Sequence, residues 1–154
     1  MSDSPHLTDL TLRHVDPSKL LFEHLNPADP EWRPSWFGLI NESGLALTGW
    51  INGTVKATIE AGYLRQSCVV AVAITGFYGT DEQIGAPNSD TVEVDDSVLS
   101  GATDDERLEF STRAIRELYP YLRAELQILS SRMSGYSGIA LQPEPQINVE
   151  LDDV

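Results

Sequence analysis

The segment "CVVAVAITGFYG" (residues 68–79) constrains the fold most, because its first seven residues are all apolar. Side chains of a β-strand alternate between two faces, so both faces of this strand are apolar. One face has Cys68, Val70, Val72 and Ile74, and the other has Val69, Ala71 and Ala73. A strand buried on one face only would carry polar residues on the second. We therefore expect a strand that is covered on both faces, or one whose second face meets another molecule.

The rest of the first half also has the alternation of β-strands. Strands are expected over residues 6–15, with a second apolar run at 20–22, and over 35–40, 45–51 and 53–64. Residues 41–44, "NESG", are expected to form a hairpin turn between two of them. The segment "HLNPADPEWRP" (24–34) has three prolines, which predicts a fixed, extended connection.

A long helix is predicted in the last third, capped by Thr103 or Asp104 and followed by Gly135 as a stop. Its apolar stripe has helical spacing and comprises Leu108, Ile115, Leu118, Tyr119, Leu122, Leu126, Leu129 and Met133. Pro120 lies inside this stripe, where a proline costs roughly 3 kcal/mol because it lacks an N–H and crowds the preceding turn. We expect a break or kink within about two residues of Pro120, with the main helix restarting there.

The 154 residues suffice for one domain, and 24 acids against 10 bases give a net charge of −14. Such a charge disfavours nucleic acid and anionic membranes as partners. Nine acids and no base lie between Asp81 and Glu106. Residues 81–103 also contain glycine and proline, and they are expected to form an acidic insertion with room for a short strand at "TVEVDDSVL" (91–99).

No residue pattern predicts an enzyme. The three histidines are scattered, and there is no glycine-rich phosphate loop, nucleophile elbow or calcium-binding register. Neither a metal nor another cofactor is expected. The single cysteine, Cys68, and the lack of a signal peptide or a long apolar segment favour a cytoplasmic protein without membrane insertion.

Three tryptophans and a phenylalanine cluster around the proline-rich connection: Trp32, Trp36, Phe37 and Trp50. They either anchor the connection to the core or line an apolar groove, because apolar patches mark partner sites. A strand that is apolar on both faces, like residues 68–74, is more often explained by an oligomer contact than by a ligand groove.

The order of these features resembles the SecB chaperone family. The matching segments are "FEHLNPADPEWRP" (22–34), "AVAITGFYGT" (71–80), the motif "YPYLR" (119–123), Ser131-Arg132, and then Ile139, Leu141 and Pro143. The resemblance covers about residues 7–148, apart from the acidic insertion.

The resemblance implies an α+β fold, in which a four-stranded antiparallel sheet of Greek-key type packs with one long helix. It implies a single domain over 1–154 that assembles as a dimer or a dimer of dimers, a homotetramer. It also implies an ATP-independent holdase that binds non-native polypeptides in apolar grooves. The groove residues would be Trp32, Trp36, Ile40, Val70, Val72, Ile74, Leu122 and Leu126, and the helix-entry motif Tyr119, Pro120, Tyr121 and Arg123.

The sequence departs from the family in places that affect the partner. Glu23 keeps one carboxylate of the surface that docks the export motor SecA, but Lys19 and Ala71 replace two others. The second C-terminal helix of the family is not expected, because the sequence ends at "INVELDDV". Divergent relatives of this kind include chaperones that guard an antitoxin.

Two alternatives stay open. The first is a non-chaperone scaffold subunit with one dedicated protein partner, as in a toxin–antitoxin system. The second is a small enzyme with a helix packed on a sheet, such as a hot-dog thioesterase, which the late position of the helix disfavours.

Overall fold

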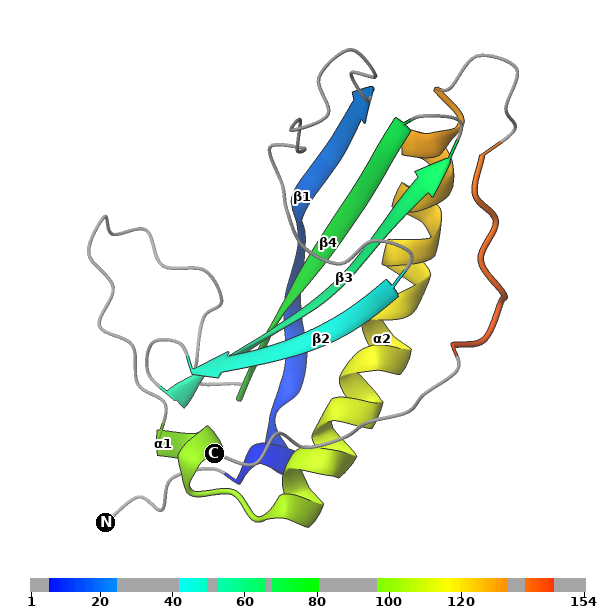
Figure 1. Cartoon of the computed structure of the whole chain (residues 1–154). Helices are drawn as coiled ribbons and strands as arrows, with labels where there is room; N and C mark the ends of the chain where they lie inside the picture. The colour runs from blue at the N-terminus through cyan, green and yellow to red at the C-terminus, as the bar shows by residue number, and fades with distance from the viewer. Residues whose placement is uncertain are drawn as a thin grey trace, which may run out of the picture.

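The computed structural model describes residues 6–24, 42–49, 53–65, 68–80, 97–132 and 138–145. A short 3₁₀ helix, η1 (Leu7–Asp9), precedes strands β1 (Thr11–His24), β2 (Glu42–Gly49), β3 (Val55–Arg65) and β4 (Cys68–Gly79). Helices α1 (Ser97–Ser100) and α2 (Asp104–Ser130) follow. The strands form one layer, and α2 lies across one face of it (Figure 1). This is the α+β class that the sequence predicts.

The sheet has the order β1-β4-β3-β2, and every neighbouring pair is antiparallel. The predicted four-stranded antiparallel sheet is therefore confirmed. Strands β2, β3 and β4 follow one another in space, and β1 lies beside β4, which is a Greek-key order.

Two strand predictions need correction. The apolar runs at 6–15 and 20–22 belong largely to one strand, β1, which continues through Pro17. Pro17 is tolerated because β1 is an edge strand, and a bulge follows at Ser18. The predicted turn at 41–44 is also wrong, because Glu42, Ser43 and Gly44 already pair with β3. The expected strand at 35–40 lies outside the described residues.

Strand β4 is buried over its whole length, as its two apolar faces predict. Val70, Val72 and Ile74 face α2 and belong to the main core. Gly76 marks the closest approach of α2, because a Cβ there would lie 2.7 Å from Leu118 Cδ2 and 2.9 Å from Leu12 Cδ1. A side chain at position 76 would push the helix off the sheet.

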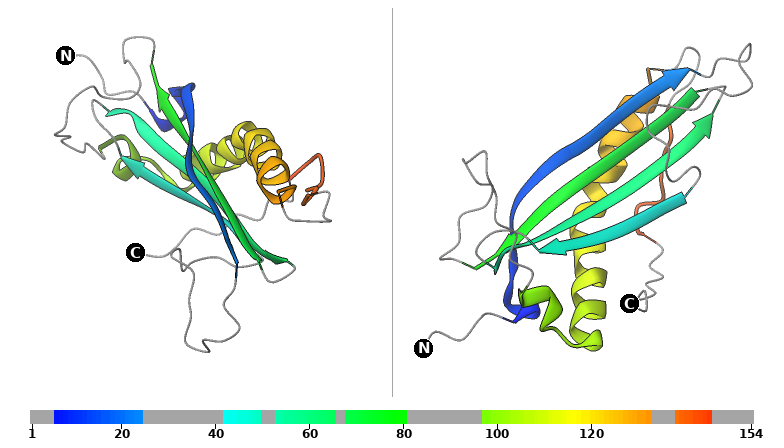
Figure 2. Two further views of the ribbon diagram at one scale, coloured as in Figure 1. Left: turned by 90° about the horizontal axis from the view of Figure 1, so that it is seen from above. Right: turned by 60° about the vertical axis from the view of Figure 1, so that its left-hand side comes forward.

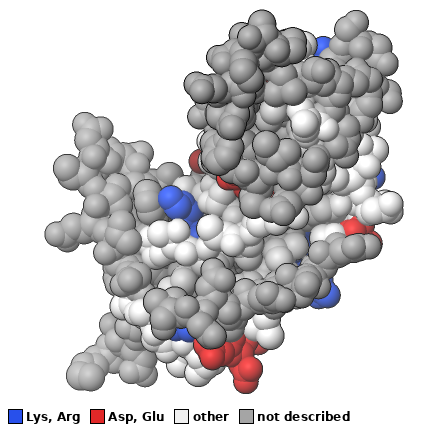
Figure 3. Space-filling model, viewed as in Figure 1, with Lys and Arg blue, Asp and Glu red and all other residues white. Residues whose placement is uncertain are grey.

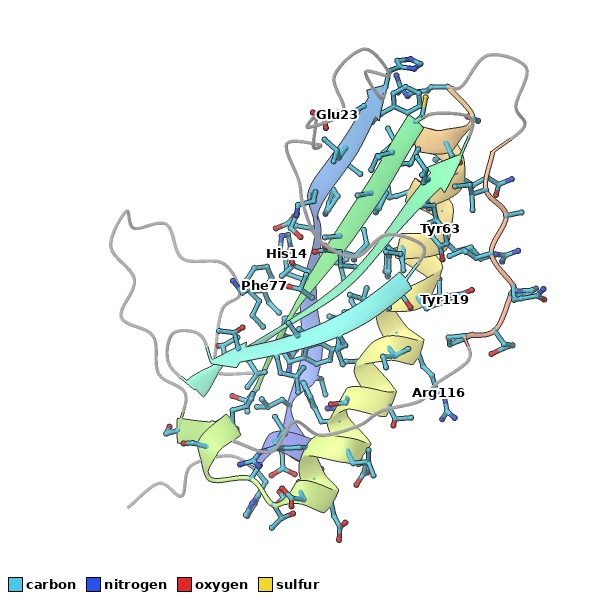
Figure 4. All side chains as sticks on the ribbon, viewed as in Figure 1. His14, Glu23, Tyr63, Phe77, Arg116 and Tyr119 are labelled. Atoms are coloured by element: carbon cyan, nitrogen blue, oxygen red, sulfur yellow. The ribbon has the colours of Figure 1, made fainter. Side chains whose placement is uncertain are left out.

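Helix α2 is continuous through Pro120, so the predicted break and restart are wrong. Pro120 is exposed, and the residue four positions earlier, Arg116, points away from the sheet (Figure 4). Water can therefore satisfy the Arg116 carbonyl that loses its helical partner, and the proline ring meets no packed neighbour. The cap at Thr103 is confirmed: its hydroxyl accepts a hydrogen bond from Glu106 N at 3.1 Å.

The helix differs from prediction at both ends. It ends at Ser130, before Met133, and Leu108 is exposed although it was expected in the apolar stripe. Phe110 and Ala114 are buried near the start of the helix instead. Residues 97–100 form α1 rather than part of a strand, with Val98 buried, and residues 81–96 of the expected insertion lie outside the described part of the chain.

Candidate functional site

The two sides of α2 differ in what lies beside them, and neither side is packed against the sheet as the buried face of the helix is. In Figures 1 and 2, β1 lies on one side of α2 and residues 138–145 on the other. We call the β1 side the open flank and the side that holds residues 138–145 the clamped flank. None of the described helices is long and apolar enough to cross a membrane.

The open flank begins at the edge strand β1. Leu20 and Val72 are direct partners across the β1–β4 ladder, so their side chains share the face that α2 covers. Val72 is fully buried, whereas Leu20 is 52% exposed. Phe22 and Val15 are half-buried at the margin of the same core. The helix therefore covers β4 but leaves the β1 margin of the sheet open.

On α2, Tyr121 and Ile128 are 48% and 57% exposed, and they lie across the helix from Arg123 and Ser130 of the clamped flank, so we count them with the open flank. Seven residues apart, they lie on one side of the helix. Leu129, next to Ile128, is half-buried against the core. The open flank is thus defined by Val15, Leu20, Phe22, Tyr121, Ile128 and Leu129.

The backbone beside the open flank is an edge. Among the described strands, β1 pairs only with β4, so every second residue of β1 directs its N–H and C=O away from the sheet. Two bulges interrupt its register, at Arg13 and Ser18. The Ser18 hydroxyl donates to Ala73 O at 3.3 Å and accepts from Thr75 Oγ1 at 2.8 Å, which fixes the second bulge. The longest part of β1 without a bulge is residues 19–24.

On the clamped flank, α2 holds residues 138–145 through polar side chains. Tyr119 OH donates to Gln142 O at 2.5 Å, and Arg123 Nε donates to Leu141 O at 3.1 Å. Ser130 Oγ accepts from Ile139 N at 2.6 Å. As the segment number rises, the helix number falls, so the segment runs antiparallel to α2, as Figure 1 shows.

Burial accompanies these bonds. Ile139 is only 7% exposed and belongs to the core, and Leu141 packs against that core. Tyr119 lies between α2 and this segment, near Tyr63 of β3 (Figure 4). Burial raises the pKa of Tyr119 above its ordinary value, against the opposing effect of Arg123. The hydroxyl therefore stays protonated at neutral pH and remains a donor.

The structure places the predicted groove residues in two groups. Val70, Val72, Ile74, Leu122 and Leu126 come together, but at the buried interface between sheet and helix rather than on a surface. Trp32, Trp36 and Ile40 lie outside the described residues. Glu23 is half-buried on β1, on the face of the sheet opposite α2, where its partner is Val69.

The helix-entry motif has a different role from the one expected. Tyr119 and Arg123 hold residues 138–145, whereas Pro120 and Tyr121 are exposed. Sequence reasoning missed Leu20 and Ile128 as exposed apolar residues, and Ser130 and Gly138 as parts of the clamped flank. Ile128 had a signal, because it falls outside the helical stripe that predicts the core.

Other reactive side chains form pairs rather than a catalytic group. Cys68 Sγ lies 3.0 Å from His24 Nδ1, with Cys68 buried, and His14 Nε2 lies 2.8 Å from Asp16 Oδ2. Among the described residues, no three His, Cys, Asp or Glu side chains are grouped as metal ligands would be.

One polar cluster is buried where α2 meets η1 and the end of β4. Burial and the nearby Glu117 carboxylate raise the pKa of the Tyr78 hydroxyl. Neither the Tyr78 hydroxyl nor Glu117 Oε1 has a hydrogen-bond partner among the described groups, and Glu117 Oε1 lies 3.8 Å from Arg113 Nε as an ion pair. Arg113 bonds Leu10 O at 2.6 Å and lies over the Phe110 ring at 5.2 Å. The Arg113–Leu10 bond ties α2 to the residue that follows η1.

Comparison with protein-family models, with curated proteins and with solved structures gives no match for this chain. The SecB-like assignment therefore stays a prediction from the sequence.

Proposed function

We propose that the protein is an ATP-independent, SecB-like holdase that binds apolar segments of non-native polypeptides on the open flank. The observation that carries the proposal is the exposure of three large apolar side chains, Leu20 on β1 and Tyr121 and Ile128 on α2. Large apolar side chains that gather at the margin of a core, with a strand edge beside them, are typical of polypeptide-binding surfaces.

The chemistry of the open flank suits an unfolded chain. Such a chain exposes apolar side chains together with unpaired backbone N–H and C=O groups. Leu20, Phe22 and Ile128 offer apolar contact, and Leu20 and Phe22 lie on β1, the outer strand of the described sheet. No nucleotide is needed, because apolar burial supplies the binding free energy.

Charge supports the same function. Acidic side chains gather at the lower end of the molecule, where α2 begins with Asp104, Asp105 and Glu106 (Figure 3). Together with the net charge of −14, they would keep a complex with an apolar client soluble through mutual repulsion. They also favour client segments that carry lysine or arginine beside their apolar residues.

The proposal includes a cytoplasmic protein that forms a dimer or a homotetramer. SecA is the less favoured partner: Lys19 and Glu60 lie 3.9 Å apart as an ion pair and Ala71 is buried, so an acidic docking surface is reduced at both positions. A dedicated client such as an antitoxin remains the alternative, and the experiment below separates it from a general holdase.

The experiment measures the aggregation of a chemically denatured client by light scattering, without nucleotide. The wild-type chain should suppress aggregation at a small molar excess. Replacing Leu20 and Ile128 by Asp should weaken suppression more than about tenfold, because each apolar contact is worth about 1.5–3 kcal/mol. Leu108→Asp is the matched control, since Leu108 is 41% exposed on the same helix but outside the open flank.

Equal loss in the Leu20/Ile128 variant and in the control would contradict the site. No suppression by the wild-type chain, together with capture of one folded protein, would contradict the holdase and favour the dedicated partner.

A further inference from the structure

Residues 138–145 lie on α2 as a bound peptide would. Three of them bond to side chains that span α2 from Tyr119 to Ser130. That span is about 16 Å of helix at a rise of 1.5 Å per residue. Ile139 to Gln142 can cover at most about 11 Å even when fully extended, the side chains bridging the rest. The segment therefore has to be extended to reach all three partners.

All three bonds go to main-chain atoms of the segment: Ile139 N, Leu141 O and Gln142 O. Only two of its side chains, Ile139 and Leu141, pack against the core. Ala140, Gln142, Pro143 and Glu144 are exposed. The clamped flank thus recognises an extended backbone with apolar side chains at two alternate positions, and little else of the sequence.

We infer that the clamped flank is a binding site for extended polypeptide segments of this pattern, which residues 138–145 occupy in the free protein. An incoming segment with two alternate apolar residues would make the same bonds to Tyr119, Arg123 and Ser130. Residues 138–145 compete for this site, so an incoming polypeptide segment must displace them. The inference concerns the side of α2 opposite the proposed client surface, and it stands whether or not the holdase proposal holds.

Gly138 sets how firmly the segment is held. Its φ of +103° is a conformation that glycine adopts readily and other residues rarely do. A Cβ there would lie 2.8 Å from Gln127 O, a main-chain atom of α2. Alanine at position 138 would therefore weaken docking of the segment and leave Tyr119, Arg123 and Ser130 in place.

The covalent connection makes the competition strong. Only seven residues, 131–137, join α2 to the segment. A short connection gives an effective concentration on the order of millimolar, so a free peptide of equal affinity binds only weakly while the segment is docked. Weakening the docked state raises the fraction of free sites, and the apparent affinity for the free peptide rises in proportion.

The test uses a fluorescent peptide with the sequence of residues 138–145 and the full-length chain. By fluorescence anisotropy, the Gly138→Ala chain should bind the peptide at least about tenfold more tightly than the wild-type chain. Adding Tyr119→Phe and Arg123→Ala to Gly138→Ala should remove this gain. A peptide with Asp at the positions of Ile139 and Leu141 should not bind.

Gln142→Ala is the control, because it changes an exposed side chain and keeps the carbonyl that Tyr119 bonds. It should behave as the wild-type chain does. Circular dichroism checks that each variant is folded, and Ile139→Ser replaces Gly138→Ala if that chain is not. Equal peptide binding by the wild-type and released chains, or a gain that survives loss of Tyr119 and Arg123, would overturn the inference.

The holdase proposal fails separately, in the aggregation assay, which depends on Leu20 and Ile128.

Discussion

The two flanks belong to the same helix, α2, but differ in how far their apolar side chains are exposed. On the clamped flank, Ile139 is buried and three side chains of α2 bond the backbone of residues 138–145. On the open flank, Ile128 and Leu20 are apolar and more than half exposed. Residues 138–145 thus cover the apolar side chains on one side of α2, whereas no described segment covers Ile128 and Leu20 to the same extent. The same helix therefore has one side that is packed within the chain and one side that is available to a partner.

The largest effect is expected from Ile139→Asp on the clamped flank. Losing this buried side chain and placing a carboxylate in the core should lower the free energy of unfolding by about 2–3 kcal/mol. Ile128→Asp on the open flank should change it by no more than about 0.5 kcal/mol. Urea unfolding of the two variants measures the difference. Equal destabilisation would show that the two flanks are packed alike.

Ser130→Ala should have the next largest effect. Ser130 is fully buried, and its hydroxyl accepts the Ile139 N–H while donating to Leu126 O at 2.7 Å. Without the hydroxyl the Ile139 N–H loses its partner inside the protein, which should cost about 1–3 kcal/mol. Hydrogen exchange at Ile139 should accelerate, and unchanged exchange there would contradict the contact. Ser131→Ala is the matched control, because Ser131 is exposed.

Tyr119→Phe should cost less, about 0.5–1.5 kcal/mol, because Gln142 is exposed and water can replace the lost donor. Tyr119 also predicts a pH dependence. Its pKa in the folded chain is above the ordinary value of 10.0, so folding favours the protonated form. The stability that the folded chain gains from the protonated Tyr119 hydroxyl is fully present below pH 10, and it is lost as the pH rises through the higher pKa of the folded state.

The wild-type chain should therefore lose stability in alkaline solution, and Tyr119→Phe should reduce that loss. Tyr78 also has a raised pKa and adds to the alkaline slope, so Tyr78→Phe is the reference variant. An alkaline slope that Tyr119→Phe leaves unchanged would contradict the buried donor.

The smallest change in stability is expected from Tyr121→Ser on the open flank, within about 0.5 kcal/mol. Thermal unfolding measures it. The same variant should weaken the suppression of client aggregation, because it removes apolar surface without disturbing the core. A large loss of stability would place Tyr121 in the core of the folded assembly instead of on a client surface.

Much of the fold could be predicted from the sequence. The two apolar faces of residues 68–74 predict a buried strand, and the alternation over 53–64 predicts another strand. Both are present, as β4 and β3. The cap at Thr103 follows from local chemistry. Leu108 was misassigned because the helix turns its core-facing side along its length, so Phe110 is buried and packs on Tyr78 with ring centres 4.8 Å apart.

The site was harder to predict, because it depends on which apolar residues the fold leaves uncovered. Leu20 and Phe22 have the same pattern as a buried strand, and only the position of β1 at the edge leaves Leu20 exposed. Ile139 and Leu141 alternate in the sequence, where they appear only as part of the resemblance to the SecB family. The docking of this segment on Tyr119 and Arg123 needs a tertiary arrangement that no local pattern specifies. Pro120 does not break α2, because the neighbouring side chains Leu118, Tyr119 and Leu122 are packed in the core, and this packing is likewise not specified by a local pattern.

Site-specific photo-crosslinking can locate the surface of the protein that a non-native polypeptide contacts. A photoreactive phenylalanine analogue is placed at Leu20, Ile128, Leu64 or Leu108, all of which are exposed apolar positions, and each chain is mixed with a denatured client. We expect crosslinks from positions 20 and 128 and few or none from positions 64 and 108. Equal crosslinking from all four positions, or crosslinking from 64 and 108 alone, would contradict the open flank as the polypeptide-binding surface.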